Sequence, residues 1–106
     1  QPVFLGCALP QRRFTVSLDQ ARGVPPGREV PVEFASEAGR VTLRLRAEST
    51  ELGDMLRAEL PFDPSLGRVL AEGRTLRITV AGRTERMPLA GTRSGVAALA
   101  AACGAR

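Results

Sequence analysis

The sequence contains no histidine, lysine, tyrosine or tryptophan among its 106 residues, and it has only four phenylalanines. Without histidine and lysine, the chain cannot build a Ser-His-Asp or Cys-His site, a Schiff-base lysine, a Walker lysine or a histidine metal site. The scarcity of aromatic rings also argues against stacking of sugars or single-stranded nucleic acid. Most common catalytic designs are therefore excluded, and we predict no catalytic residue, no metal ligand and no cofactor.

All fifteen basic residues are arginine, and the formal net charge is only +4. The complete lack of lysine indicates a GC-rich coding bias, so the number of arginines is a weak clue to function. No apolar run approaches the roughly eighteen residues of a transmembrane helix, and no membrane span is predicted. The first residues lack the sections of a signal peptide, so an export signal would have been removed before Gln1.

Alternation of apolar and polar residues with a period of two predicts a series of half-buried strands. Beyond a first apolar strand that contains Cys7, they cover residues 14–18, 30–34, 41–46, 56–62, 75–80 and 86–89. The polar stretch Glu48–Asp54 predicts the turn of a hairpin between two of them. Pro31 has no backbone N–H, which predicts an edge strand or a bulge and argues against a central position for its strand.

Two segments have helical signals. Asp63 is a good N-cap, Pro64 suits the first helical position and Gly73 ends an apolar stripe, which together predict a short helix of two turns. A second helix, capped by Ser94 or Thr92, would place Cys103 on the same inward stripe as the apolar residues before it. We therefore predict a single β-rich domain over residues 1–106. Its fold class is mainly β, an antiparallel sandwich or partly closed barrel of six or seven strands with one short and one C-terminal helix; a single sheet with the helix on one face is the alternative.

The two cysteines, Cys7 and Cys103, lie at opposite ends of the chain. A disulfide between them would join the first strand to the last helix, and closing so long a loop contributes about 4 to 5 kcal/mol in the chain-entropy model. The alternative is a pair of buried free thiols, because reduced cysteine is a common core residue. A disulfide would indicate an oxidising compartment, which predicts a periplasmic or secreted protein.

Two groups of residues are candidate binding surfaces. Outward-facing arginines on neighbouring strands could bind an acidic partner, unless they pair across strands with Glu48, Glu59 or Glu33 on a solvated face. These arginines are Arg44, Arg46, Arg57 and Arg77. The second group, Thr92, Arg93 and Ser94, precedes a helix whose free N–H groups could hold an anion, although a cap and tight turn account for the same residues.

Carboxylates are the remaining candidates for chemistry. Glu48, Glu51 and Asp54 cluster in sequence, and together with Glu33 they could supply a general acid and base if one lay in a cleft with a raised pKa. The spacing matches no EF-hand loop. A polar hairpin turn is a sufficient account of the cluster.

The C-terminal third carries a resemblance to known proteins. The run Leu70–Val80 reads Leu-Ala-Glu-Gly-Arg-Thr-Leu-Arg-Ile-Thr-Val, and it is followed by Pro88-Leu-Ala-Gly91 and a helix of small residues that ends in Cys103. This arrangement resembles small exported bacterial β-domains of the invasion-associated locus B family and periplasmic accessory proteins associated with type VI secretion. The resemblance implies a location in the cell envelope and a binding or accessory role, with no catalytic residues.

Three functions follow from these observations. The leading hypothesis is a non-enzymatic secreted or periplasmic domain that contacts another envelope or secreted protein as an accessory subunit or inhibitor, through strand edges or the arginine face. The second is a polyanion binder that uses its arginines. The third is a hydrolase that depends on two carboxylates.

Overall fold

The computed structural model describes residues 3–104, which form seven strands and two helices. The strands are β1 (Val3–Ala8), β2 (Arg13–Leu18), β3 (Glu29–Ser36), β4 (Gly39–Thr50), β5 (Gly53–Leu60), β6 (Thr75–Val80) and β7 (Arg83–Pro88). The helices are α1 (Pro64–Glu72), between β5 and β6, and α2 (Arg93–Cys103), after β7. The predicted fold class, mainly β with one short and one C-terminal helix, is confirmed.

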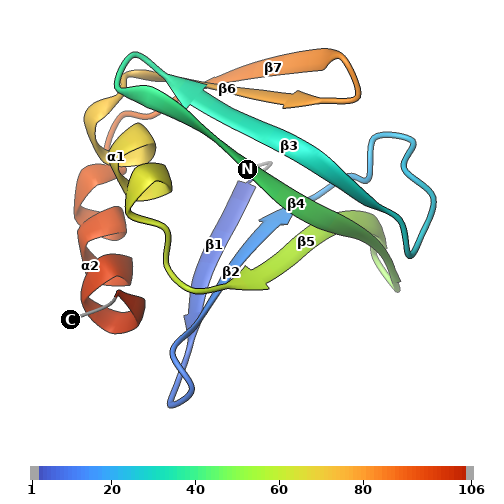
Figure 1. Cartoon of the computed structure of the whole chain (residues 1–106), viewed down its shortest axis with the longest axis horizontal. Coiled ribbons are helices and arrows are strands. Elements are labelled where there is room, and N and C mark those ends of the chain that lie inside the picture. Colours follow the sequence, from blue (N-terminus) through green and yellow to red (C-terminus); the bar gives the residue numbers. More distant parts are fainter. Residues whose placement is uncertain (1–2, 105–106) are drawn as a thin grey trace.

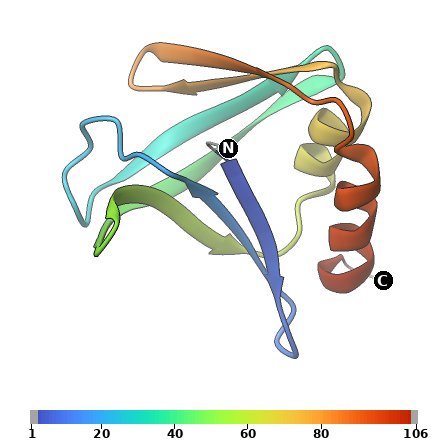
Figure 2. The same ribbon diagram turned by 180° about the vertical axis from the view of Figure 1, so that it is seen from behind.

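All seven strands belong to one antiparallel sheet in the order β1-β2-β5-β4-β3-β6-β7. The sheet curls into a half-barrel, and the two helices pack side by side at one end of it (Figures 1 and 2). The outermost strands are β1 and β7, each hydrogen-bonded to one neighbour only. Of the alternatives that the sequence left open, the structure is therefore a partly closed barrel.

The core lies between the inner face of the sheet and the helices. Alternate residues of each central strand point inward, and burying each large apolar side chain contributes about 1.5–3 kcal/mol. The largest fully buried side chains are Phe14, Phe34, Leu18, Leu45, Leu56, Leu66, Leu76, Ile78, Val16, Val32, Val69 and Val80. The core thus joins the five central strands, β2 to β6, to α1.

Helix α1 begins and ends as its sequence predicts. The Asp63 carboxylate accepts hydrogen bonds from the backbone N–H groups of Ser65 at 2.8 Å and Leu66 at 3.3 Å, and Pro64 occupies the first helical position. The helix stops before Gly73, which packs so closely on Ser36 that a Cβ atom there would collide with the serine side chain. The requirement for glycine here is therefore steric.

Helix α2 follows β7 and returns toward β1. Its N-cap is Thr92, but the threonine side chain makes no capping hydrogen bond to the helix. Val96 and Cys103 are its buried residues. Neither helix within residues 3–104 has the length and apolarity that a membrane crossing requires.

Hairpin turns set the registers of neighbouring strands. Ala81 and Gly82 both adopt positive φ, 51° and 81°, the backbone of the two-residue turn that suits the twist of a hairpin, and they join β6 to β7. The predicted hairpin between β4 and β5 is confirmed, but its turn is shorter than the predicted Glu48–Asp54. Strand pairing continues to Thr50 opposite Gly53, so most of the polar residues that predicted the turn belong to paired strands.

The prediction that Pro31 marks an edge strand or a bulge is wrong. Its strand, β3, lies between β4 and β6 and is central in the sheet. Pro31 pairs with Arg44 of β4, whereas the contact with β6 begins only at Val32. The residue without an N–H therefore occupies the part of β3 that has a neighbour on one side only, which is why a central strand tolerates it.

Candidate functional site

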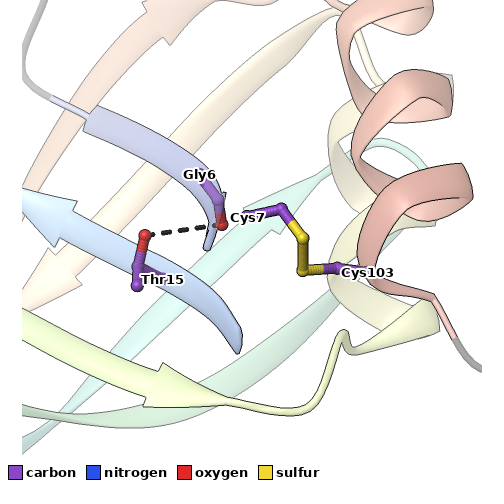
Figure 3. Close-up of a disulfide and its surroundings, with 4 residues drawn as sticks. All are labelled: Gly6, Cys7, Thr15 and Cys103. Atoms are coloured by element: carbon purple, nitrogen blue, oxygen red, sulfur yellow. Dashed lines mark hydrogen bonds between the residues drawn. A yellow bond between two sulfur atoms is a disulfide. The ribbon is translucent and has the colours of Figure 1, made fainter. Parts of the chain in front are cut away.

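Cys7 and Cys103 form a disulfide, with an S–S distance of 1.95 Å and a Cα–Cα distance of 5.8 Å (Figure 3). The bond connects the inner face of β1 to the last residue of α2 and spans 96 positions in sequence. Beside it, the Thr15 hydroxyl donates a hydrogen bond of 3.4 Å to the Gly6 carbonyl, which adds to the pairing of β1 with β2. The predicted disulfide is confirmed, and the free-thiol alternative is excluded.

Three of the four predicted surface arginines lie together, but they are paired with glutamates. Arg44 and Arg46 approach the two carboxylate oxygens of Glu29 at 3.5 and 3.9 Å, and Arg57 bonds Glu59 at 2.8 Å. They line one open depression of about 310 Å³ with Glu29, Glu48, Ala58 and Glu59. Three arginines thus face three glutamates, so this part of the surface has no net formal charge.

Glu59 accepts hydrogen bonds from two arginines on this face. Its carboxylate receives Arg57 on one oxygen and Arg13 on the other, both at 2.8 Å. The hydrogen bond from Arg57, followed by the one from Arg13, lowers the pKa of Glu59 below its ordinary value of 4.5. The carboxylate is therefore held as the ionised partner of two guanidinium groups, which suits a structural role.

The fourth predicted arginine, Arg77, lies apart on β6. It lines a separate depression of about 440 Å³ with Glu33, Glu37 and Arg40. Its neighbour across the strand pair is Arg86 of β7, on the same face of the sheet. Among residues 3–104, neither of these two arginines has an ion pair.

The predicted anion site at the start of α2 has its side chains engaged elsewhere. The Thr92 hydroxyl lies 2.9 Å from the Leu70 carbonyl and 2.8 Å from the Leu89 carbonyl. Arg93 donates through Nε to the Ala71 carbonyl at 3.4 Å, while Ser94 is exposed. Thr92 and Arg93 thus connect the start of α2 to the end of α1, but the predicted side-chain cap by Thr92 does not form. Anion binding stays a prediction.

The structure does not gather the four predicted carboxylates. Glu51 and Asp54 are exposed and Glu33 and Glu48 are half-buried, so none lies in a closed cleft. Asp54 accepts a hydrogen bond of 2.6 Å from the Ser49 hydroxyl, and Glu33 is 3.9 Å from Arg40. No group of three or more potential metal ligands occurs in the described part of the chain. The arrangement lacks the paired, buried carboxylates that general acid–base hydrolysis requires.

Sequence reasoning did not identify the role of Glu37. Its carboxylate accepts hydrogen bonds from the backbone N–H groups of Arg74, at 2.7 Å, and Thr75, at 3.1 Å. These two bonds, with that from its own N–H, lower the pKa of Glu37 from 4.5 to about 2, the Arg74 bond having the largest effect. Glu37 therefore attaches the turn between β3 and β4 to the start of β6. No local pattern in the sequence signals this contact between residues 37 positions apart.

Sequence reasoning also did not identify an apolar groove between β1 and α2. Val3, Leu5 and Cys7 form one wall, and residues of α2 form the other. This second wall consists of Thr92, which precedes the helix, and of Gly95, Val96, Ala98 and Leu99 of α2. The groove has a volume of about 500 Å³. The available signal was the uncharged sequence Val-Phe-Leu-Gly-Cys-Ala of β1, which is unusual for an edge strand.

Comparison with known proteins finds similarity among solved structures only. No family model matches the chain, and no curated protein matches it. Among solved structures, the crystal structure of invasion associated protein b from Bartonella henselae is similar, with a TM-score of 0.44, 16% sequence identity and coverage of 94% of this chain and 92% of that chain. The overlap is long but loose, and no argument about this chain rests on it. Membership of the family that the C-terminal segment resembles stays a prediction.

Proposed function

We propose that this chain is a non-enzymatic, secreted or periplasmic domain that acts by binding another protein, as an accessory subunit or an inhibitor. The observation that carries the proposal is the apolar surface at β1. Val3, Leu5 and Cys7 line the groove between β1 and α2, and Phe4, on the opposite face of the same strand, is 52% exposed. Exposed apolar residues along an uncharged edge strand are typical of protein–protein contact sites.

The disulfide supports the proposed location. Such bonds form and persist in oxidising compartments, whereas cytosolic thiols are kept reduced. Here the bond joins the two elements that line the groove, β1 and α2. A reducing compartment would therefore loosen the surface to which we assign the function.

A pull-down tests the proposal. The oxidised chain is immobilised and exposed to envelope extract of the source cell, at low and at high salt, beside a Phe4→Glu variant. Leu52→Glu is the matched control, because Leu52 is an apolar residue that is fully exposed at the far β4–β5 turn. We expect a protein partner that withstands salt, is lost with Phe4→Glu and is retained by Leu52→Glu. Capture of no protein above background would reject the function.

One observation favours polyanion binding as a second candidate. Seven arginines and four glutamates lie on the outer face of the sheet, and Arg77 faces Arg86 without an ion pair among the described residues. Like charges placed opposite each other are unfavourable unless an anion lies between them. Binding to a heparin column should then weaken in an Arg77→Gln/Arg86→Gln variant more than in Arg44→Gln/Arg46→Gln. Equal elution of the two variants would reject this candidate.

A further inference from the structure

The free edge of β1 and the apolar groove are two parts of one surface. β1 is hydrogen-bonded to β2 alone, so alternate residues along it present N–H and C=O groups away from the sheet. Val3, Leu5 and Cys7, on the inner face of the same strand, form one wall of the groove. An extended chain laid along this edge could therefore pair its backbone with β1 and place every second side chain in the groove.

The far wall of the groove is built to receive such side chains. Val96 and Leu99 form its apolar floor, while Gly95 and Ala98 are exposed and have side chains too small to fill the space. At one end of the groove, the disulfide holds Cys103, the last residue of α2, next to Cys7 of β1, with 5.8 Å between their Cα atoms. The spacing between strand and helix is thus fixed before any ligand arrives, which reduces the ordering cost of binding.

The charges around the groove indicate what kind of segment would occupy it. Residues 3–18 and 86–104 contain no acidic side chain, and these two stretches include both elements that line the groove. The charged residues within these stretches are Arg12, Arg13, Arg86 and Arg93, and of these only Arg13 has an ion pair, with Glu59, among residues 3–104. A second copy of the chain would bring arginines against arginines, whereas acidic residues beside the apolar positions of a partner would complement them.

We propose that β1 and α2 bind an extended segment of a partner protein, which adds to the sheet as a strand beside β1. The segment has alternating apolar residues and acidic residues at its ends. This proposal rests on the proposed function and names the mode of binding and the chemistry of the partner. Backbone hydrogen bonds to β1 supply affinity, and the groove supplies specificity through alternate side chains.

Selection from a displayed library of random decapeptides tests the proposal with the oxidised full chain as bait. An Ala98→Glu variant serves for counter-selection, because it places a charged side chain in the groove at an exposed helical position. Ala101→Glu is its matched control, since Ala101 is exposed on the same helix but does not line the groove. We expect enriched peptides with period-two apolar residues and acidic ends. Ala98→Glu should weaken their binding by about tenfold or more and Ala101→Glu by less than about twofold.

Backbone methylation of the enriched peptides separates strand addition from simple apolar contact. Methylating the alternate peptide nitrogens that face β1 (the first frame) removes the hydrogen bonds to β1. Methylating the nitrogens that point away from β1 (the second frame) leaves these bonds intact. We expect one frame to weaken binding by about tenfold and the other to have little effect. Hydrogen exchange should show added protection of β1 amides on peptide binding, with no change in β7.

Several results would overturn the proposal. They are an absence of enrichment, enriched peptides with helical periodicity, equal tolerance of methylation in both frames, or no added protection in β1. A dimer in sedimentation velocity that Ala98→Glu dissociates would identify a second copy as the occupant instead. If envelope extract yields a partner that Ala98→Glu still captures, the protein-binding function stands and the groove proposal fails. If it yields none, the function itself fails.

Discussion

The two edges of the sheet are protected in opposite ways. β7 reads Arg-Thr-Glu-Arg-Met-Pro, with charged residues on both faces and a proline at its end, which are features that discourage pairing with another strand. β1 reads Val-Phe-Leu-Gly-Cys-Ala and has none of these features. One edge of the sheet is thus protected against pairing with another strand, whereas the other is apolar, uncharged and open to it.

The edges also differ in how they are attached to the rest of the molecule. β1 is joined to α2 by a covalent bond, the disulfide of Cys7. The β6–β7 hairpin is held by charge, through Glu37 on the backbone N–H groups at the start of β6 and through an ion pair between Glu85 and Arg22, whose side chain is only 9% exposed. One edge is therefore sensitive to redox conditions and the other to pH. Four predictions test this contrast.

The largest effect is expected from a Cys7→Ser/Cys103→Ser variant. Loss of a cross-link between residues 96 positions apart should lower the free energy of unfolding by about 4 kcal/mol. Urea unfolding measures it, and the reduced wild type should behave like the variant. Hydrogen exchange should accelerate in β1 more than in β7. Equal acceleration at both edges would contradict the contrast drawn here.

A smaller loss is expected from Gly73→Ala, which affects the entry to β6. The added Cβ would collide with Ser36, whose hydroxyl donates a 2.8 Å hydrogen bond to the Val69 carbonyl. We expect a loss of about 2 kcal/mol, as is usual for overpacking. Gly95→Ala is the control, because no atom lies within 4 Å of the added Cβ and alanine favours a helix, so that variant should be unchanged or more stable.

Removing the charge of Glu85 should weaken the β7 edge by a smaller amount. In Glu85→Gln, the nearly buried Arg22 guanidinium loses its carboxylate, and we expect a loss of about 1 kcal/mol because Glu85 itself is half exposed. Thermal unfolding at low salt measures the change. Glu59→Gln, on an exposed pair of the outer face, should have a smaller effect. A larger effect at Glu59 would show that the ion pairs of the outer face contribute more to stability than the pair between Arg22 and Glu85.

The smallest effect at neutral pH is expected for Glu37→Gln, because a neutral amide oxygen can accept the same two N–H groups. The pKa of Glu37 is about 2 in the folded protein against an ordinary 4.5. The ionised carboxylate therefore stabilises the fold above pH 4.5, and this contribution is lost as the pH falls toward 2. Stability measured by urea unfolding across this range should fall more steeply in the wild type than in the variant. Parallel curves would contradict this assignment.

Local features of the fold were predictable from the sequence because they depend on residues close together. Asp63 and Pro64 located the start of α1, and alternation located the strands. Pro31 was misleading, because its effect depends on how far β6 extends along β3, which is decided by the register of strands more than forty residues apart. Sequence alternation assigns a face to each residue but does not say which strand is its neighbour.

The candidate site was less predictable for the same reason. Cys7 and Cys103 could be paired because they are the chain's only cysteines. The outward direction of the arginines was correctly expected, but Glu29, which approaches both Arg44 and Arg46, was not among the expected partners. The groove depends on α2 returning across the molecule to β1, and Glu37 depends on a contact between two loops. Neither arrangement has a local signature.

The position of the disulfide also determines how the molecule would carry a mechanical load. A pull applied before Cys7 and after Cys103 passes directly across two residues whose Cα atoms are 5.8 Å apart. The 95 residues between them, including the whole sheet beyond β1, would bear little of that tension. With the bond intact, the load would bypass everything from β2 to α2 and would act only on the part of β1 before Cys7, including Val3 and Leu5 of the groove wall. With the bond reduced, the same pull would separate α2 from β1.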